Sequence, residues 1–261
     1  MESLAHNLRL VSWNIRSGGG KRIEGIFGQL LKWQPDIIGL SEFRGTPASQ
    51  WVAQALHAAG YPHQYSTVNL DKLAVNSLLL ASRFPFELVT LPDMPTIKER
   101  WLLARINCNP AITIGVMHVP NYTTPKRKYP FLDALLKMTK AWKQGPAILM
   151  GDTNCGKRGV DEEKRSPPKF QREHDFIVGI ETNGWLDVFR HRHGDRREYT
   201  WYSHRNNGFR LDYAFGSPHF HGAIIEVQHK WGISKTEPER REGLSDHAAL
   251  VIDVDLSKMT G

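Results

Sequence analysis

Four short apolar runs in this chain each end abruptly in polar residues, and this pattern constrains the fold more than any other feature. The runs are LRLVSWN (8–14), DIIGLSE (36–42), ITIGVMHVPN (112–121) and AILMGDTN (147–154). Near-continuous apolar segments of this length are typical of strands that are buried on both faces. We therefore expect buried strands whose ends carry polar side chains.

Helical patterns lie between these runs. Apolar residues recur over residues 23–31 at the i, i+3, i+4, i+7 and i+8 spacing of one helical face. Similar stripes lie at 51–59, at 132–139 and around 176–180. Each stripe would cover one face of a sheet, and the alternation of strands with helices is typical of α/β proteins.

Strand-like segments also follow one another without an intervening helix, at residues 76–86, 87–91 and 101–106. Such neighbours pair in antiparallel fashion. We therefore predict an α/β (α+β) fold, a four-layer α/β/β/α sandwich of two mixed β-sheets flanked by helices. The chain has 261 residues, 40% of them hydrophobic, and no long linker or repeat, so we expect one domain over residues 1–261.

The net charge favours a polyanionic partner. Lys and Arg total 34 against 27 Asp and Glu, a formal net charge of +7. Because many proteins are basic for solubility alone, the positions of the charges matter more than their sum. The irregular stretch 155–170 is interpreted as a functional loop. The basic residues that follow or flank the polar motifs are Lys126, Arg127, Lys128, Lys157, Arg158, Arg205 and Arg210.

Cysteine usage and the N-terminus bear on the compartment. The two cysteines, Cys108 and Cys155, form no C-x-x-C pair and favour a reducing compartment. The segment Met1–Asn7 is polar, and no apolar stretch reaches the ~18 residues of a membrane span. We expect a protein of the cytoplasm, or of the nucleus in a eukaryote, without a membrane partner.

The strongest local motif is Gly151-Asp152-Thr153-Asn154, which follows a buried run. An acid and an amide at a strand end suit a base that is held in a fixed direction. Standing alone, these residues would more often close the strand in an Asx turn.

A second motif, Ser245-Asp246-His247, precedes the strand-like run 248–256. Adjacent side chains on a strand face opposite ways, so Asp246 and His247 should have different partners. His247 needs another carboxylate to orient its imidazole and favour its charged form, and Asp212 is the candidate. Alone, a histidine here would more often be an ordinary surface or core residue.

Asn14, Glu42 and Asp246 offer oxygen ligands at strand ends. Mg²⁺ prefers such ligands, whereas zinc would require more His or Cys. We therefore expect Mg²⁺ at these residues, with Mn²⁺ able to substitute. Taken singly, Glu42 is better explained as a helix cap or surface acid, and Asn14 as a strand-ending turn.

In order along the chain, six motifs resemble those of the endonuclease/exonuclease/phosphatase superfamily. They are SWN (12–14), LSE (40–42), HVPN (118–121), GDTN (151–154), RLDY (210–213) and SDH (245–247).

Within that superfamily the similarity is greatest to exonucleases and abasic-site (AP) endonucleases. The segment YTWYSHRNNGFRLDYAFGSP (199–218) is similar to the one that lines their extruded-sugar pocket. The resemblance implies that Trp201, Phe209 and Leu211 line this pocket, although Trp201 could equally be a core aromatic. In the same segment Arg205 and Arg210 are expected to approach phosphate.

The resemblance also implies catalytic roles. Asp152 would orient or deprotonate the attacking water, and Asn154 would align that water or contact the phosphate. His247, paired with Asp212, would donate to a non-bridging phosphate oxygen. Asn121 would help to hold the phosphate.

The implied metal ligand is Glu42, with Asn14 and Asp246 near the metal. Two positions depart from the AP endonuclease pattern. His118 replaces a tyrosine, and could protonate a leaving 3′ oxygen as in pancreatic-type deoxyribonucleases. Arg16 replaces an acid, which leaves the number of metals open.

The resulting hypothesis is a Mg²⁺-dependent nuclease, AP endonuclease-like or 3′-exonuclease-like, that acts as a monomer on intact, damaged or abasic DNA. One alternative is a phosphatase or phosphodiesterase of the same superfamily for a small or lipid-linked phosphoester. Another is a non-catalytic DNA-binding module. The sequence does not choose between endo and exo action, or between DNA and RNA.

Overall fold

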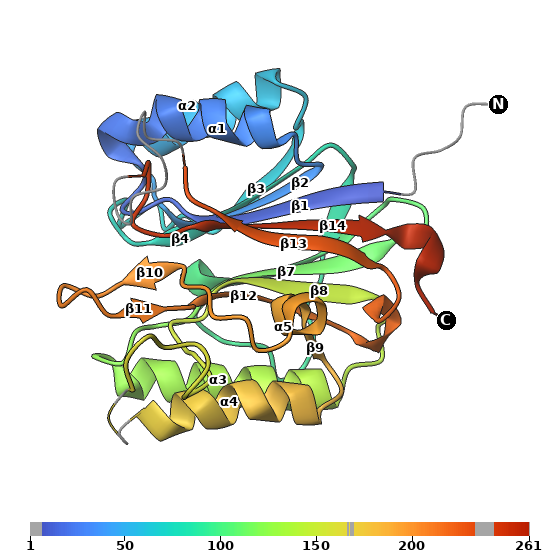
Figure 1. Cartoon of the computed structure of the whole chain (residues 1–261). Helices are drawn as coiled ribbons and strands as arrows, with labels where there is room; N and C mark the ends of the chain where they lie inside the picture. Colours follow the sequence, from blue (N-terminus) through green and yellow to red (C-terminus); the bar gives the residue numbers. More distant parts are fainter. Residues whose placement is uncertain (1–6, 166, 168–169, 233–242, 261) are drawn as a thin grey trace.

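Two six-stranded mixed sheets pack face to face, with helices on their outer faces (Figure 1). The computed structural model describes residues 7–165, 167, 170–232 and 243–260. The arrangement is the four-layer α/β/β/α sandwich that the sequence predicts, because apolar strands alternate with helices that are apolar on one side.

The first sheet is covered by α1 (Ile23–Trp33) and α2 (Pro47–Ala58). Its strands, in spatial order, are β13 (Ile224–Lys230), β14 (Ala249–Asp255), β1 (Asn7–Asn14), β2 (Ile37–Phe43), β4 (Ser77–Ser82) and β3 (His63–Ser66). Only β1 and β2 run parallel, with α1 as their crossover helix.

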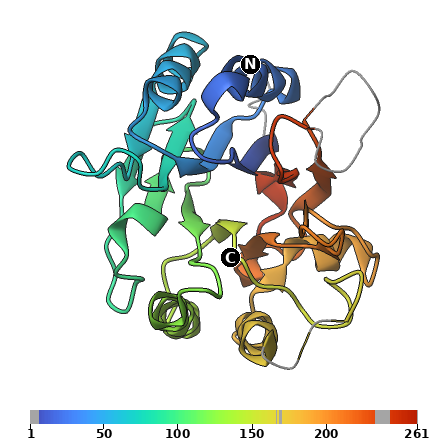
Figure 2. The same ribbon diagram turned by 90° about the vertical axis from the view of Figure 1, so that its left-hand side faces the viewer.

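The second sheet is covered by α3 (Pro125–Lys140) and α4 (Gln171–Thr182), which Figure 2 shows end-on. Its strands, in spatial order, are β5 (Phe86–Leu88), β6 (Trp101–Ile106), β7 (Ile112–His118), β8 (Ala147–Asp152), β12 (Asp212–Gly216) and β9 (Leu186–Asp187). Here β7 and β8 form the parallel pair, connected through α3.

Smaller elements complete the fold. The short helix α5 (Val188–His193) contacts β12 and β13, and β10 (Trp201–Tyr202) pairs with β11 (Gly208–Phe209) in a separate hairpin. Short 3₁₀ turns lie at Gly20–Arg22, Lys98–Arg100, Pro218–Phe220 and Leu256–Lys258.

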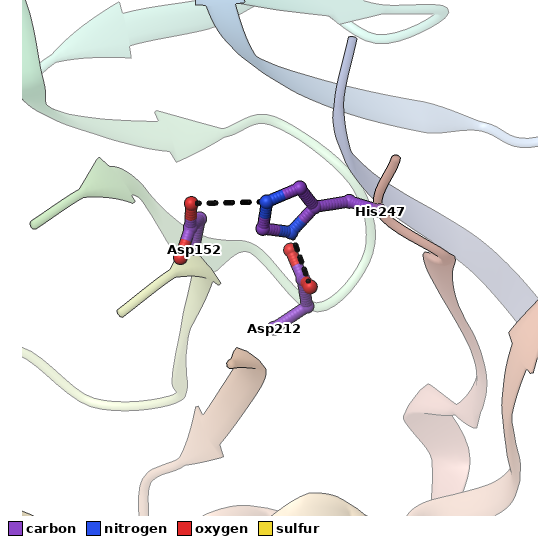
Figure 3. A group of neighbouring side chains, drawn as sticks. All are labelled: Asp152, Asp212 and His247. Carbon is purple, nitrogen blue, oxygen red and sulfur yellow. Dashed lines mark hydrogen bonds and ion pairs between the residues drawn. The ribbon is translucent and has the colours of Figure 1, made fainter. Parts of the chain in front are cut away.

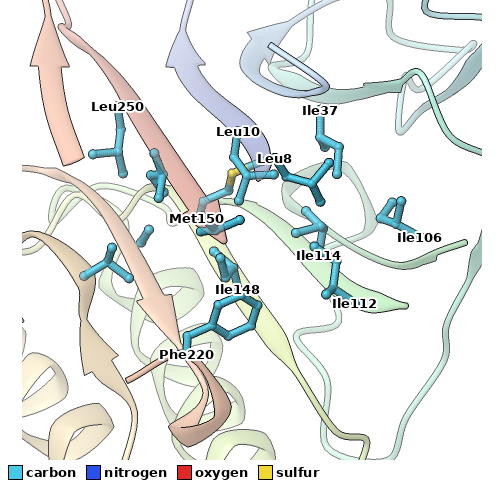
Figure 4. Packing of buried hydrophobic residues seen from close by; sticks show 14 of the residues in the cluster. Leu8, Leu10, Ile37, Ile106, Ile112, Ile114, Ile148, Met150, Phe220 and Leu250 are labelled. Atoms are coloured by element: carbon cyan, nitrogen blue, oxygen red, sulfur yellow. The ribbon is translucent and has the colours of Figure 1, made fainter. Parts of the chain in front are cut away.

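Three apolar layers hold the sandwich together. Between the sheets, Leu10 and Leu250 of the first sheet pack with Ile114, Ile148 and Met150 of the second (Figure 4). Two further clusters seat α1 and α2 on the first sheet and α3 and α4 on the second. Burial of these side chains is the main favourable term in folding.

The strands expected from the apolar runs all occur, and the four expected helices occur with longer bounds. The edge strands β3 and β13 were not expected, because β3 is mostly polar and the apolar residues of β13 are interrupted by Glu226 and followed by polar residues. Among the described residues, no helix is both long enough and apolar enough to cross a membrane.

Gly151 lies in β8, paired with Met117 of β7, and has φ of 151°. A Cβ atom there would stand 1.9 Å from the Met117 carbonyl oxygen, so no side chain fits without a backbone shift. We predict that Gly151→Ala lowers the free energy of unfolding by about 2 kcal/mol or more, measured by urea denaturation.

The matched control is Gly28→Ala in α1, where a Cβ would meet nothing within 4 Å. Alanine is the better helix former, so this variant should be as stable as the wild type or more stable. Equal stability of the two variants would contradict the steric explanation.

Candidate active site

The polar strand ends meet at one edge of the sandwich, the edge that faces the viewer in Figure 2. Carboxyl ends of parallel strands lie at the same edge of a sheet. The parallel pair of the first sheet brings Asn14 and Glu42 there, and that of the second sheet brings His118 and Asp152. Asp212, at the start of antiparallel β12, pairs in register with Asp152.

His247 lies between two carboxylates (Figure 3). Its Nδ1 is 2.9 Å from Asp212 Oδ2, and its Nε2 is 3.8 Å from Asp152 Oδ2. All three side chains are buried. The pairing of His247 with Asp212 that the sequence predicts is therefore present.

Asp152 and His247 carry opposite charges at neutral pH. Burial alone would lower the pKa of His247, but Asp212 and Asp152 outweigh burial and raise the pKa to about 10. Burial raises the pKa of Asp152 to about 6, with Asp212 adding to the shift and His247 opposing it. At neutral pH the imidazole is thus a cation and Asp152 is mostly a carboxylate.

Asp152 is held from several directions. Its Oδ2 accepts a hydrogen bond from Asn14 Nδ2 at 3.0 Å, and its Oδ1 accepts one from the backbone N–H of Asn154 at 2.8 Å. The Asn154 amide nitrogen also donates to the Val119 carbonyl. These contacts fix the direction of the carboxylate.

The backbone around His247 is equally constrained. The Trp13 indole N–H donates to the His247 carbonyl at 3.0 Å, and Ser245 Oγ donates to the Asn14 carbonyl at 2.5 Å. Trp201 forms a β-bridge with His247, which ties the β10–β11 hairpin to the site. The serine of the SDH motif thus joins two strand ends.

Glu42 reaches the site through a backbone irregularity. The register of β2 and β4 shifts between Ser41 and Phe43, and Glu42 in between has φ of 57°, a region that non-glycine residues rarely adopt. Its Oε2 accepts a hydrogen bond from the Ser17 N–H at 2.6 Å. Strain of this kind clusters at functional sites, where surrounding contacts maintain it.

Two groups of residues could hold a divalent cation. Ligand atoms of Asp152, Asp212 and His247 lie within 4.8 Å of one another, but a doubly protonated imidazole has no lone pair to offer. Glu42 and Asp246 both face the cavity with carboxylate oxygens, and Asn14 contributes an amide oxygen. The two cavity carboxylates are the oxygen ligands that fit a hard cation, and Asn14, whose amide oxygen also accepts from the Arg16 N–H, lies next to them.

His118 is buried between Arg100 and Asp152. Its Nδ1 lies 2.8 Å from Arg100 Nη1, and its Nε2 lies 3.6 Å from Asp152 Oδ2. Burial, helped by the charges of Arg100 and His247, lowers the pKa of His118 well below its usual value. Because Nδ1 accepts from the guanidinium, His118 is a neutral imidazole with its proton on Nε2.

A cavity of about 570 Å³ opens over these residues, large enough for a small-molecule or nucleotide group. Tyr122 and Phe170 on one wall are perpendicular rings 5.3 Å apart. Asn14 and Asp212 do not line the cavity themselves, but they contact Asp152 and His247, which do. The predicted site residues that do line it are Glu42, His118, Asn121, Asp152, Asn154, Trp201, Phe209, Leu211, Asp246 and His247.

Asn121 keeps its predicted place at the cavity, in the turn before α3. Its side-chain oxygen accepts a hydrogen bond from the Thr123 N–H at 3.1 Å. Because that oxygen is engaged, the amide N–H₂ is the part of Asn121 suited to an anionic ligand.

Arg210 corrects the sequence prediction of a phosphate contact. The side chain is fully buried, away from the cavity lining, and its guanidinium pairs with Asp161 at 2.7 Å and with Asp187 at 2.5 Å. It also stacks over the Tyr213 ring at 3.9 Å. Two carboxylates neutralise it, so Arg210 joins Asp161 of the 155–165 loop to Asp187 of β9.

Lys128 also differs from expectation, because it is fully buried and makes no phosphate contact. Its Nζ donates to the Asn154 carbonyl at 2.8 Å and pairs with Glu173 at 3.2 Å. Arg205 is exposed in the turn of the β10–β11 hairpin and is not among the residues that line the cavity.

Sequence reasoning missed Arg100 and Asn76, which both line the cavity. Each directly precedes a strand, β6 or β4, that runs antiparallel to a central strand. The start of such a strand lies beside the carboxyl end of its neighbour. A polar residue just before a strand that pairs antiparallel with a central strand could therefore have identified both residues as candidates for the cavity.

A model of the endonuclease/exonuclease/phosphatase family matches residues 11–247. The chain belongs to this family. Its members are hydrolytic nucleases and phosphoesterases that depend on a divalent metal ion, and the acidic residues at the cavity suit one. The match confirms the resemblance that the six motifs indicate.

Two curated relatives, both named exodeoxyribonuclease, come from strains of Streptococcus pneumoniae. Each is 28% identical over 127 residues, which are 44% of this chain and 43% of the relative. The chain therefore spans less than half the length of these relatives in the match.

Solved structures share the fold of this family member over nearly its whole length. A 3′ phosphatase, NExo, from Neisseria bound to product DNA hairpin has a TM-score of 0.74 and 21% identity, over 95% of this chain and 99% of that one. An AP endonuclease from Archaeoglobus fulgidus has a TM-score of 0.75 and 22% identity, over 94% and 98%.

The buried pair of Arg210 and Asp161 should give stability a defined pH dependence. Burial alone would raise the pKa of Asp161, but Arg210 outweighs burial and lowers it to about 2. A carboxyl whose pKa is depressed on folding stabilises above its unfolded pKa, about 4, and loses that contribution as pH falls toward 2. We predict that Asp161→Asn lowers the free energy of unfolding at pH 7 by about 3 kcal/mol.

Urea denaturation at pH 7 and pH 3 measures the effect, and the gap between Asp161→Asn and wild type should narrow at the lower pH. The control is Asp195→Asn, at an exposed position, which should change stability little at either pH. If the difference in free energy of unfolding between Asp161→Asn and wild type is the same at both pH values, the assigned ion pair is contradicted.

Proposed function

We propose that this protein is a Mg²⁺-dependent nuclease that hydrolyses phosphodiester bonds of DNA, in the manner of AP endonucleases and 3′-exonucleases of DNA repair. One observation carries the proposal. A single cavity combines an ionised carboxylate, Asp152, a cationic imidazole, His247, and two further carboxylates, Glu42 and Asp246.

The opposite charges of Asp152 and His247 define complementary roles. A carboxylate with a pKa of about 6 is ionised at neutral pH and basic enough to orient a water molecule and take its proton as the water attacks phosphorus. His247, kept cationic by Asp212, donates from Nε2 to a non-bridging phosphate oxygen as negative charge develops there.

Neutral residues would complete phosphate binding. Asn154 and Asn121 both line the cavity, and the Asn121 amide N–H₂ is the group suited to the phosphate, since the Asn154 amide nitrogen donates to the Val119 carbonyl. His118 is neutral, so we assign it a hydrogen bond to the substrate rather than the role of a strong acid for the leaving 3′ oxygen.

Glu42, Asp246 and Asn14 would hold the metal ion. When bound, Mg²⁺ or Mn²⁺ would supply positive charge that stabilises the phosphorane-like transition state. The Glu42 bulge and the hydrogen bond from Ser17 hold one of these carboxylates in place for that purpose.

Three observations support DNA as the substrate. The net charge is +7, and basic residues such as Arg127 and Arg158 line the cavity. Trp201 and Phe209, with centroids 6.1 Å apart, offer rings to a sugar or base. The curated relatives are named exodeoxyribonuclease, and NExo was solved with a product DNA hairpin.

The two sheets share one core and a single chain supplies every residue of the site, so we propose one domain over residues 1–261 that acts as a monomer. Both cysteines are unpaired, in keeping with a reducing compartment such as the cytoplasm or nucleus.

Metal dependence provides the first test. With a labelled duplex that carries one abasic site, cleavage should occur with Mg²⁺ or Mn²⁺, stop with excess chelator and return when Mg²⁺ is restored. The same assay on intact, nicked and 3′-phosphate-ended duplexes shows which bond the protein cleaves fastest. Chelator-resistant cleavage would overturn the metal assignment.

The base is tested by Asp152→Asn. This change removes the proton acceptor but keeps the shape, so the rate of cleavage should fall about 10²–10⁴-fold while DNA binding, measured by fluorescence anisotropy, is retained. Asp195→Asn, at an exposed position that is not among the cavity-lining residues, is the control and should cleave at the wild-type rate. Full activity of Asp152→Asn would exclude the proposed base.

Salt dependence separates DNA from a small phosphoester substrate. Counterion release makes DNA binding fall steeply with salt concentration, whereas a small phosphoester has a much shallower dependence. Efficient, salt-insensitive hydrolysis of a small phosphoester, without cleavage of DNA, would favour the phosphatase alternative.

A further inference from the structure

Two aromatic side chains of the cavity, Tyr122 and Phe170, have no part in the hydrolysis proposed above. Tyr122 follows Asn121 in the turn before α3, and Phe170 directly precedes α4. Both line the cavity, and their rings meet edge to face with 5.3 Å between the centroids. Tyr122 is 51% exposed. A large aromatic ring that stays accessible in a cavity is suited to a ligand with a flat apolar face.

The backbone places Tyr122 close to the carboxylate of Asp152. The Val119 N–H donates to the Asp152 carbonyl at 2.9 Å, and the Val119 carbonyl accepts from the Asn154 amide at 2.9 Å. Tyr122 comes three residues later, so its Cα is within about 11 Å of the Val119 Cα. It also adjoins Asn121, the amide that would hold the phosphate. A group on the Tyr122 ring would therefore belong to a nucleotide next to the cleaved bond.

Phe170 is held in place by α4, which packs against α3. Lys128 of α3 pairs with Glu173 of α4 at 3.2 Å, near the start of both helices. Farther along, Leu136 packs closely against Gly179, so the two helices run in the same direction and both begin at the cavity. The two rings are therefore positioned by the packing of the outer helix layer.

Trp201 and Phe209 lie on the other side of Asp152. In the second sheet, the strand β8 that ends in Asp152 lies between β7 and β12. The segment with Tyr122 follows β7, whereas the β10–β11 hairpin with Trp201 and Phe209 leads into β12. Since the hairpin rings are assigned to the sugar or base on one side of the reacting phosphate, Tyr122 is left for the nucleotide on the other side.

Basic residues beside the two rings favour a nucleotide over an uncharged apolar ligand. Arg127 lies in the first turn of α3, and Arg158 donates to the side chain of Gln171, the residue after Phe170, at 2.7 Å. Both arginines line the cavity. Aromatic rings next to cations are the combination that binds the bases and backbone of a single strand.

Stacking restricts which nucleobase can bind. Inside a duplex, neighbouring bases cover both faces of each base. A protein ring can therefore stack only on a base that is unpaired, terminal or turned out of the helix.

We propose that Tyr122, supported by Phe170, stacks on an unpaired nucleobase, that of the nucleotide across the cleaved bond from the Trp201 side. The inference rests on the proposed nuclease function and deepens it, because it names the substrate class. The preferred substrate is DNA whose strand is unpaired beside the cleaved bond, such as a frayed end or a mismatch, rather than a continuous duplex.

A pair of matched duplexes tests the subsite. Both carry one abasic site, and they differ only in whether the nucleotide across the cleaved bond from it is paired or mismatched. The wild type should cleave the mismatched duplex with a kcat/KM about tenfold higher, because the mismatched base is free to leave the stack and bind the ring.

The same duplexes are then cleaved by two variants of Tyr122. Tyr122→Leu keeps an apolar side chain but removes the ring, so its kcat/KM on the mismatched duplex should fall about tenfold while the paired duplex is little affected. Tyr122→Phe keeps the ring and should retain the wild-type preference. The position is exposed and outside the helices and strands, so both variants should fold, which circular dichroism checks.

Tyr65→Leu is the matched control, since Tyr65 is a tyrosine of similar exposure, 41%, that lies on β3 and does not line this cavity. It should keep the wild-type preference. Equal cleavage of the two duplexes by the wild type, or an unchanged preference in Tyr122→Leu, would overturn the subsite although DNA is cleaved. Failure of the wild type to cleave any duplex would instead reject the nuclease function, and the subsite with it.

Discussion

The site depends on contacts between the two sheets, and the buried carboxylate of Asp152 is the centre of these contacts. Asp152 ends a strand of the second sheet, but the Asn14 amide that donates to it and the His247 imidazole that faces it belong to the first. Since Asp212 of the second sheet also holds His247, each sheet orients groups supplied by the other. Packing of the apolar layer between them therefore sets the geometry of the candidate site.

Sequence reasoning succeeded where position along a strand decides the outcome. Apolar runs that end in polar residues predicted the central strands, and the resemblance of the ordered motifs grouped Asn14, Glu42 and Asp152 in advance. Parallel pairing in each sheet explains why the strand ends lie at one edge. Pairing of His247 with Asp212 followed from the need of an imidazole for a carboxylate. These rules are local or depend only on strand direction.

Sequence reasoning failed where the counter-ion of a basic side chain lies far away in the sequence. Arg210 and Lys128 stand beside the polar motifs of the candidate site, yet both are buried, because Asp161, Asp187 and Glu173 neutralise them. Nothing in the local sequence distinguishes a cation with such counter-ions from one that awaits a phosphate. Arg100 was missed because its place at the cavity depends on the register of β6 against β7. Edge strands such as β3 escaped notice because half-exposed strands need few apolar residues.

The buried lysine has a consequence for how the enzyme should lose activity on heating. Lys128 of α3, paired with Glu173 of α4, holds the carbonyl of Asn154, and Asn154 is in a left-handed conformation with φ of 47°. The outer helices therefore hold this turn in place through the Lys128 side chain. Loosening of α3 against α4 would release that turn while both sheets are still intact, so inactivation should precede cooperative melting of the sandwich.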